Sequence, residues 1–329
     1  MTKKVLTAEE RFVKENKISS KYSLAKKIDP KLWETITKIE EHYTEYSKNC
    51  DAIVKRTLLE ILDAKELEGI HSARFRVKTT NSLLVKIISK KAFLSEDKMD
   101  DYEIEKYRDL DSSNYYKIIT DVSGIRILIR YREQWQTVHN WIWNKFYKGD
   151  EYYLKNFVSD YRQNEGKSFI AEKPKVYYRN QKDLFFYEQL GRDIFEFKES
   201  DEGYNSIHYL INVDGKYIEI QVRTILDEAW SECTHDVVYK CKNSSKKKEL
   251  EYLSQCLSQQ TIAAEMITNL IYEKATNSGV LFSNKTEGKL NKNNTTSSTD
   301  KYPQNEVRDR IKLLEKSEID FDGNIDSLI

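Results

Sequence analysis

Polar side chains recur at every second position along residues 206–223. The two halves of this segment alternate between apolar and polar residues, and Asp214 and Gly215 between them form the favoured sequence of a two-residue type I′ turn. We therefore predict a β-hairpin in which Ile207 pairs with Val222 and Ile211 with Ile218 on an apolar face. The opposite, polar face carries Ser206, His208, Glu219, Gln221 and Arg223.

This polar face has two interpretations. One is the solvated outer side of an antiparallel sheet, which needs no ligand. The other is a binding site, because a carboxylate and several hydrogen-bond donors can be buried together only with partners. Tyr204 follows Gly203 at the entry to the hairpin, and Glu219 lies among the donors. These two features favour a site for a polar, anionic ligand.

A second candidate site lies in His71–Lys91, which has six basic residues and no acidic one. A helix is expected to begin near Thr80 or Asn81. Basic side chains beside the free N–H groups of a helix N-terminus bind polyphosphates. The alternative is a solvated basic helix. The residues assigned to phosphate binding, two before the helix and two on one of its faces, are Arg76, Lys78, Ser82 and Lys86.

Asp121 opens a predicted strand over residues 121–131, in which branched residues alternate with others, and it precedes Arg126 by five positions. A carboxylate at the mouth of a strand can hold Mg²⁺ against phosphates.

The remaining elements must position these residues. Apolar spacings of three and four predict a helix over residues 32–62, and a Trp-rich segment indicates another over 135–146. An amphipathic helix is predicted over residues 246–276, with the apolar positions Leu250, Leu253, Leu257, Met266 and Leu270. A further helix follows the hairpin, with Thr224 as its N-cap and Asp227 completing a weak capping box. Short strands are predicted at 175–179 and 193–199.

Composition excludes some classes of protein. The 329 residues include 54 Lys and Arg and 54 Asp and Glu, so the chain is not a globally basic nucleic-acid coat. The balance conceals blocks, since residues 1–31 carry a net charge of +5 and residues 92–113 one of −5. No apolar run approaches a membrane span and the first residues lack a signal peptide, so we expect a cytoplasmic protein without a membrane partner. The four cysteines form no C-x-x-C pair, which disfavours a zinc site or a disulfide framework.

We predict five regions along the chain: a helical N-terminal region (1–69), an α/β core (70–241), a C-terminal helix (242–276), a flexible linker (277–302) and a short helix with an acidic, apolar tail (303–329). The tail is a candidate surface for a second copy of the chain or for a regulatory protein.

Five motifs in order resemble the RelA/SpoT-type alarmone synthetase domain, in its small class without the companion hydrolase domain. They are R-V-K-x-x-x-S-x-x-x-K (76–86), D-V-S-G-I-R (121–126), G-Y-N-S-I-H-Y (203–209), E-I-Q-V-R-T (219–224) and A-W-S-E-C-T-H (229–235). The resemblance covers roughly residues 70–241. It implies a mixed-sheet, nucleotidyltransferase-like α/β core flanked by helices, with helical N- and C-terminal extensions.

The resemblance also implies a reaction, the transfer of the β,γ-pyrophosphate of ATP to the 3′-hydroxyl of GDP or GTP, which yields AMP and (p)ppGpp. Asp121 and Glu219 would then hold Mg²⁺. Glu219 would also act as general base or second metal contact for the 3′-hydroxyl, with Gln221 beside it. The ATP-binding residues implied are Arg76, Lys78, Ser82, Lys86 and, at the adenine, Arg126. Those implied for the acceptor are Tyr204, stacked on its base, and Ser206, His208, Arg223 and His235.

Two other functions remain open at this stage. Some toxic members of the family modify the 3′-CCA end of tRNA with pyrophosphate, and the basic residues 1–31 and 71–91 suit an RNA backbone. A non-catalytic nucleotide sensor is the third function, which the presence of Asp121, Glu219 and Tyr204 disfavours.

Overall fold

The computed structural model describes residues 7–16, 30–92, 105, 107–153, 167–188, 193–200, 203–238 and 244–277. Residues Met1–Val280 group into one unit, and the second unit, Leu281–Ile329, lies outside the described residues, as do the predicted linker and tail. None of the helices in the described part of the chain is long and apolar enough to cross a membrane. The domain boundaries predicted above stay predictions.

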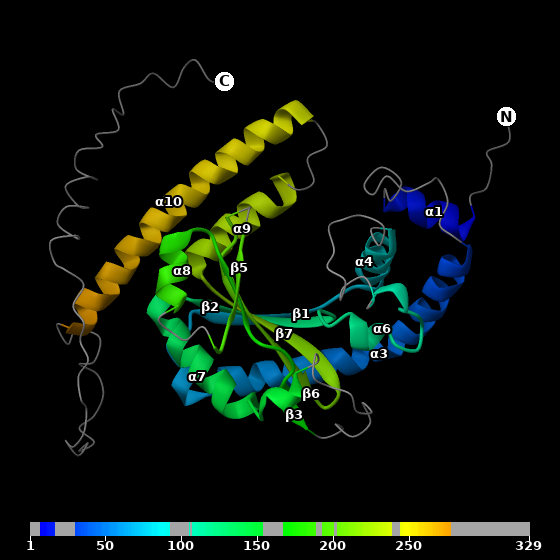
Figure 1. Ribbon diagram of the computed structural model, residues 1–329, viewed down its shortest axis with the longest axis horizontal. Coiled ribbons are helices and arrows are strands. Elements are labelled where there is room, and N and C mark those ends of the chain that lie inside the picture. Colours follow the sequence, from blue (N-terminus) through cyan, green and yellow to red (C-terminus); the bar gives the residue numbers. More distant parts are fainter. Residues whose placement is uncertain are drawn as a thin grey trace. The chain divides into compact units, whose positions relative to one another are not determined.

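The described strands form one mixed sheet in the order β1-β2-β7-β6-β4-β5, with β3 paired to β6 (Figure 1). The pairs β2–β7 and β4–β5 are parallel and the others are antiparallel. The fold is therefore mixed α/β with flanking helices, as predicted. The strands are β1 (Ser72–Val77), β2 (Ser123–Ile129), β3 (Ser168–Ile170), β4 (Lys175–Tyr178), β5 (Glu196–Glu199), β6 (Ser206–Val213) and β7 (Lys216–Thr224).

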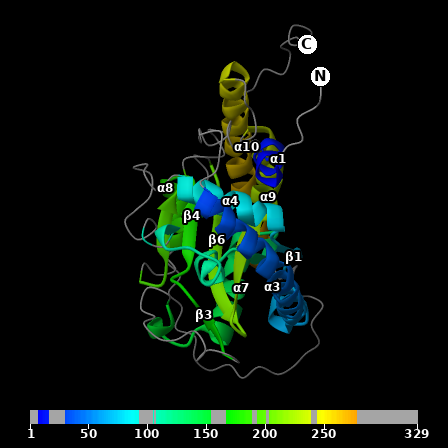
Figure 2. The same ribbon diagram turned by 90° about the vertical axis from the view of Figure 1, so that its right-hand side faces the viewer.

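Helices occupy both sides of the sheet (Figures 1 and 2). They are α1 (Ala8–Glu15), α3 (Pro30–Leu62), α4 (Thr80–Ala92), α6 (Tyr115–Ile118), α7 (Trp135–Phe146), α8 (Gln181–Glu188), α9 (Ile225–Val238) and α10 (Ser244–Asn277). Three-residue 3₁₀ turns lie at Lys65–Leu67, Arg132–Gln134 and Asp150–Tyr152.

The apolar face of the sheet packs against α3 and α7. Its core residues include Ile127 of β2, Tyr209 of β6 and Ile220 of β7, which contact Val54 of α3 and Val138 of α7 within one buried cluster. Branched side chains on alternate strand positions thus cover one side of the sheet with hydrocarbon. The side chains on the intervening positions consequently point to the other side of the sheet.

The predicted hairpin is confirmed in its turn and register. Asp214 and Gly215 have φ values of 48° and 77°, the left-handed conformation that a type I′ turn requires. Ile207 pairs with Val222 and Ile211 with Ile218. The register extends the polar rows across β1 and β2, which places Arg74, Arg126, Gln221 and His208 in one row and Arg76, Gly124 and Glu219 in the next.

The other predicted elements agree with the structure closely. Helices α3, α7 and α10 span the predicted segments within a few residues, α4 begins at Thr80, and β4 and β5 lie inside the two short predicted strands. The hydroxyl of Thr224 accepts a hydrogen bond from the backbone N–H of Asp227 at 3.0 Å and caps α9. The sequence patterns did not indicate α1, β1, β3, α6 or α8. Strand β1 is not evident from the sequence because the basic residues of SARFRV directly precede a helix.

A buried ion network joins α8, α9 and α10 on the polar side of the sheet. Arg179 binds Asp183 at 2.9 Å, Asp227 at 2.7 Å and Glu265. Arg132 binds the same Asp183 at 2.9 Å and Glu265 at 2.6 Å. These five side chains are nearly inaccessible to solvent, so each charge depends on the others for compensation.

This network explains which face of α10 is buried. The predicted apolar positions Leu253, Leu257 and Met266 are exposed, whereas the polar Ser258 and Glu265 are buried. The helix was predicted correctly, but its core-facing side is polar because Glu265 must reach the two arginines.

Asp227 and Glu265 share a proton within the network. Burial and the charge of Glu265 raise the pKa of Asp227 to about 8, while Arg132 and Arg179 outweigh the effect of burial and lower the pKa of Glu265 to about 2. At neutral pH Asp227 is therefore protonated and donates a hydrogen bond to ionised Glu265. With Asp227 neutral, the two arginines face two ionised carboxylates, Asp183 and Glu265.

We predict that Asp227→Asn removes a pH dependence of stability. The folded protein keeps the Asp227 proton between the ordinary pKa of 3.8 and about 8, whereas the unfolded chain loses it, so the wild-type free energy of unfolding falls across this range. Asparagine donates the same hydrogen bond without titrating. The unfolding free energy of the variant, relative to the wild type, should rise with pH by at most about 1.4 kcal/mol per unit.

Urea denaturation at a series of pH values measures this difference. Asp51→Asn is the matched control, since Asp51 pairs with Lys55 on the exposed side of α3. A difference that stays constant from pH 4 to pH 8 in Asp227→Asn would show that Asp227 is ionised in the folded protein.

Candidate active site

Asp121 lies two residues before β2 and receives two lysines. Lys86 of α4 and Lys78, which follows β1, contact its Oδ2 atom at 2.7 and 3.0 Å. The other oxygen, Oδ1, is buried and has no hydrogen-bond partner among the described residues. Burial alone would raise the pKa of Asp121, but the two lysines outweigh it and hold the pKa below its usual value. Asp121 is therefore ionised with one oxygen free for a ligand.

The backbone around this group is fixed by hydrogen bonds. Lys78 donates its N–H to the carbonyl of Val122 at 2.7 Å, and its carbonyl accepts the hydroxyl of Tyr43 at 2.6 Å. Thr79 then caps α4 by accepting the N–H of Ser82 at 3.3 Å. The side chains of Ser82 and Arg76 are exposed beside this group. Arg76, Lys78, Ser82, Lys86 and Asp121 thus cluster where β1 meets α4, as predicted, and we call them the basic cradle.

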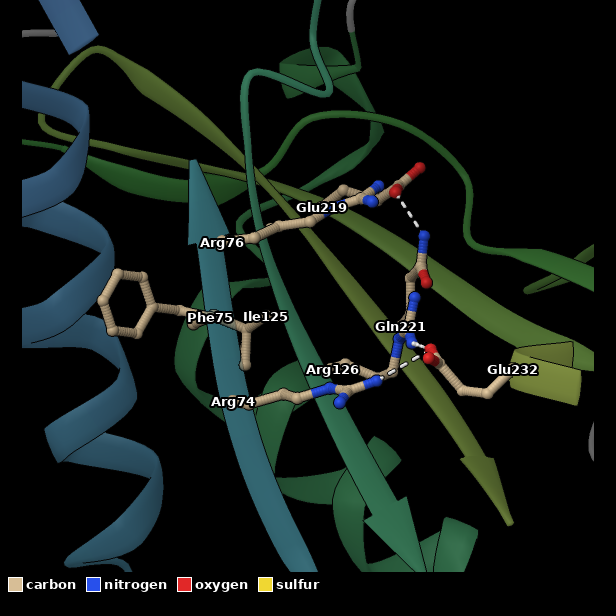
Figure 3. Close-up of a pocket in the computed structure, with 9 residues that line it drawn as sticks. Arg74, Phe75, Arg76, Ile125, Arg126, Glu219, Gln221 and Glu232 are labelled. Carbon is tan, nitrogen blue, oxygen red and sulfur yellow. Dashed lines mark hydrogen bonds and ion pairs between the residues drawn. The ribbon is translucent and has the colours of Figure 1, made fainter. Parts of the chain in front are cut away.

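Arg126 does not stand alone in its row. Its guanidinium binds Glu228 of α9 at 2.6 Å. It also binds Glu232 of α9 at 2.9 Å (Figure 3). Arg74, which pairs with Arg126 across β1 and β2, binds the same two carboxylates. The two arginines and Glu232 line a pocket of about 250 Å³ whose floor includes Gly124. A Cβ atom at Gly124 would lie 3.2 Å from the carbonyl of Glu219, so a larger residue at this position would crowd the neighbouring strand β7.

Three of the predicted acceptor residues, Tyr204, His208 and Arg223, form a ring of polar contacts with Gln221 and Glu219 at β6 and β7. Arg223 donates to the hydroxyl of Tyr204 at 2.5 Å and to the Gln221 Oε1 atom at 2.8 Å. Gln221 donates to Glu219 at 2.6 Å. The Tyr204 hydroxyl contacts His208 Nε2 at 2.9 Å, and His208 Nδ1 lies 3.4 Å from Glu219.

The ring has one direction. The Tyr204 oxygen already accepts a hydrogen bond from Arg223, so we assign the Tyr204 hydroxyl as donor to His208 Nε2. The proton of the neutral His208 ring then lies on Nδ1, which faces Glu219. The ring therefore has two arms, one through Tyr204 and His208 and one through Gln221. Both run from Arg223 as the donor to Glu219 as the acceptor. Burial would raise the pKa of Glu219, but His208, Gln221 and Arg76 outweigh it and lower the pKa to about 2. Glu219 is firmly ionised.

Tyr204 is half-buried, and its hydroxyl is bound. The Arg223 guanidinium lies 4.8 Å from the ring centroid and Tyr177 meets its edge. Ser206, in contrast, is fully buried and donates to the carbonyl of Val222 at 3.3 Å. His235 belongs to α9, but its side chain lies outside the described residues. The structure thus gathers most of the predicted site residues into the basic cradle and the ring, whereas Arg126 pairs with carboxylates of α9 and Ser206 is buried outside the ring.

The donor set fits Mg²⁺ in the way that nucleotide enzymes use it. No group of three or more His, Cys, Asp and Glu side chains within the described residues is arranged to hold a metal ion by itself. Mg²⁺ commonly takes only one or two carboxylates, with substrate phosphates and water as its other ligands. Asp121, with its free buried Oδ1, and Glu219 are carboxylates of that kind.

Comparison with known proteins identifies the family. A family model described as a region found in RelA and SpoT proteins matches residues 75–244, more than half of the chain. The chain belongs to the RelA/SpoT family. The matched segment contains every candidate site residue, from Arg76 to His235. No match was found among curated proteins.

Solved structures similar to this RelA/SpoT family member include small alarmone synthetase 1 from Bacillus subtilis bound to its product pppGpp. It is 18% identical with a TM-score of 0.37, over 75% of this chain and 100% of that chain. A GTP pyrophosphokinase family protein from Streptococcus pneumoniae is 14% identical with a TM-score of 0.35, over 78% of this chain and 100% of that chain.

Three residues of the site were missed by the sequence analysis: Arg74, Glu228 and Glu232. Arg74 stands two residues before Arg76, so recognition of β1 would have placed both on one face. Glu228 and Glu232 are four apart and share a face of α9. Their partners are distant in sequence, so only the strand order shows that they meet.

We predict that Lys86→Met weakens binding of a non-hydrolysable ATP analogue by about 10- to 100-fold, because one cation of the basic cradle is lost. Lys78→Met should have an effect of the same order and should also lower the melting temperature, since Lys78 is the more buried partner of Asp121. Isothermal titration calorimetry measures the affinity. Lys55→Met, on the exposed side of α3, is the control, and an unchanged affinity in both cradle variants would exclude the cradle as the phosphate site.

Proposed function

We propose that this RelA/SpoT family member transfers the β,γ-pyrophosphate of ATP to the 3′-hydroxyl of GDP or GTP. The observation that carries the proposal is that the basic cradle and the Glu219 ring lie side by side. They are joined through the neighbouring strands β2 and β7. One group supplies cations for a polyphosphate, and the other supplies an aromatic ring and an ionised carboxylate for a nucleoside.

The reaction is a displacement at phosphorus. The acceptor 3′-oxygen attacks the β-phosphorus of ATP, the bond from that phosphorus to the α,β-bridging oxygen breaks, and AMP leaves with that oxygen. The proton of the acceptor hydroxyl passes to water. Such chemistry needs in-line positioning and neutralisation of phosphate charge more than covalent help from the protein.

Arg76, Lys78 and Lys86 would hold the ATP phosphates, with Ser82 at the start of α4, and Arg126 with Arg74 would contact the adenosine. Asp121 and Glu219 would hold Mg²⁺, which supplies further neutralisation of the phosphate charge when bound. Tyr204 would stack on the acceptor base, with His208 and Arg223 holding its hydroxyl.

The role of Glu219 follows from its ionisation. A carboxylate with a pKa of about 2 is a poor acceptor of a proton at neutral pH. We therefore assign Glu219 to orienting the 3′-hydroxyl and to Mg²⁺ rather than to storing the proton.

We predict that Glu219→Gln and Asp121→Asn each lower the turnover number by at least roughly 100-fold, because each removes a negative charge from the reacting centre while keeping the side-chain shape. The assay supplies ATP labelled in its β- and γ-phosphates with GDP, GTP and bulk tRNA together. Label in guanosine nucleotide supports the proposal, label in tRNA would replace the acceptor, and no transfer would contradict it.

Thermal melting of both variants shows whether the fold survives. Glu196→Gln serves as the control, since Glu196 pairs with Lys198 on the accessible strand β5. Full activity in either site variant would remove that residue from the mechanism.

Two substitutions at Tyr204 separate its ring from its hydroxyl. Tyr204→Ala should raise the KM for the acceptor by about 10- to 100-fold, since a base–aromatic stack contributes about 1–3 kcal/mol. Tyr204→Phe keeps the ring and should leave that KM within about threefold, while the loss of the bond to Arg223 lowers the turnover number. Equal acceptor KM values in the alanine variant and the wild type would refute stacking.

A further inference from the structure

Glu228 is a carboxylate shared by three arginines from three strands. It lies in the first turn of α9 and is only 7% exposed. Its Oε1 atom binds Arg126 of β2 at 2.6 Å and also Arg74 of β1. Its Oε2 atom lies 3.2 Å from the guanidinium of Arg223 in β7. A rigid, planar group therefore links arginines that otherwise belong to separate parts of the site.

The two sides of Glu228 face different halves of the site. Arg74 and Arg126 line one side of the pocket, where the proposed function places ATP (Figure 3). Glu219 and Gln221 of the ring line the same pocket. Arg223 starts both arms of the ring that ends on Glu219, where the proposed function places the acceptor. Glu228 is thus the described residue whose carboxylate contacts both halves.

The contact with Arg223 is incomplete as it stands. Although Oε2 of Glu228 is within ion-pair distance, neither it nor the Nε and NH1 groups of Arg223 form an aligned hydrogen bond with any described residue. Buried polar groups of this kind normally find partners. The carboxylate therefore pairs through Oε1 with Arg126 at 2.6 Å and leaves its Oε2 atom without an aligned bond to Arg223.

The helix that carries Glu228 is fixed in place. The preceding residue, Asp227, receives hydrogen bonds from Arg179 at 2.7 Å and from Asn205 at 2.8 Å. Because this anchor holds the first turn of α9, an exchange of partners at Glu228 requires only side-chain rotation.

We propose that Glu228 is a positioning residue that couples the ATP half of the site to the acceptor half; this rests on the proposed function for the assignment of the two halves. When a bound nucleotide pairs with Arg126 in place of Glu228, the Glu228 carboxylate forms its ion pair with Arg223 instead. Arg223 is then held more firmly against Tyr204 and Gln221, and the acceptor site is completed. Binding of one substrate thereby strengthens binding of the other.

The experiment measures coupling without catalysis. Calorimetry determines the affinity of a non-hydrolysable ATP analogue and of the acceptor labelled in the transfer assay, each alone and in the presence of the other. In the wild type each ligand should strengthen the other by at least about fivefold. In Glu228→Gln the coupling factor should fall to near one, and acceptor affinity alone should fall by about tenfold.

Two variants distinguish positioning from general stability. Glu232→Gln removes a carboxylate that binds the same Arg74 and Arg126 but contacts none of the acceptor residues described, so it should change ATP affinity and keep the coupling. Glu228→Asp keeps the negative charge but shortens the side chain by one methylene, which moves the carboxylate away from the arginines. This variant should retain more coupling than Glu228→Gln. Thermal melting of all variants is recorded in parallel.

Three outcomes overturn the proposal. The first is a wild type in which the two ligands bind independently, and the second is a coupling factor in Glu228→Gln within twofold of the wild type. The third is a Glu228→Gln variant that loses thermal stability but keeps its coupling, which would make the residue merely structural. Failure of the proposed function is recognised separately, since it appears as an absence of pyrophosphate transfer by the wild type.

Discussion

The neutralisation of buried arginines by carboxylates from α9 and α10 is the interaction on which the site depends. Arg223 is 4% exposed, and Arg132 and Arg179 are similarly buried. A guanidinium does not lose its charge on burial, so each needs an anion at close range. Glu228 supplies it above the sheet, and Glu265 and Asp183 supply it behind α9. These ion pairs fix the position of α9, which carries Glu228 and Glu232 of the site.

Local patterns in the sequence were sufficient for the part of the site on β6 and β7. The turn at Asp214 and Gly215 fixes the register, and strict alternation then decides which side chains share a face. The same reasoning placed Lys78 and Lys86 together, because a helix begins between them. In both cases residues near in sequence are near in space, and the period of the element is enough.

Contacts between distant segments could not be predicted in this way. Arg74 and Glu228 are 154 positions apart, and their meeting depends on β2 lying between β1 and β7. For α10 the usual rule held only in part. Leu250 and Leu270 are half-buried, but Leu253 and Leu257 are exposed, while Glu265 is buried against two arginines that need its charge. A hydrophobic pattern carries no information on such a charge requirement.

The two carboxylates of the site, Asp121 and Glu219, differ in whether both of their oxygens have partners. Both oxygens of Glu219 have partners, one from Gln221 and one facing His208, whereas Oδ1 of Asp121 has none among the described residues. A ligand of Asp121 must therefore meet an oxygen that the fold buries, or compete with Lys78 and Lys86 for the other one. A ligand of Glu219 must displace a member of the ring. Since that ring also holds Tyr204 through His208, the state of Glu219 is tied to the aromatic ring proposed to bind the acceptor.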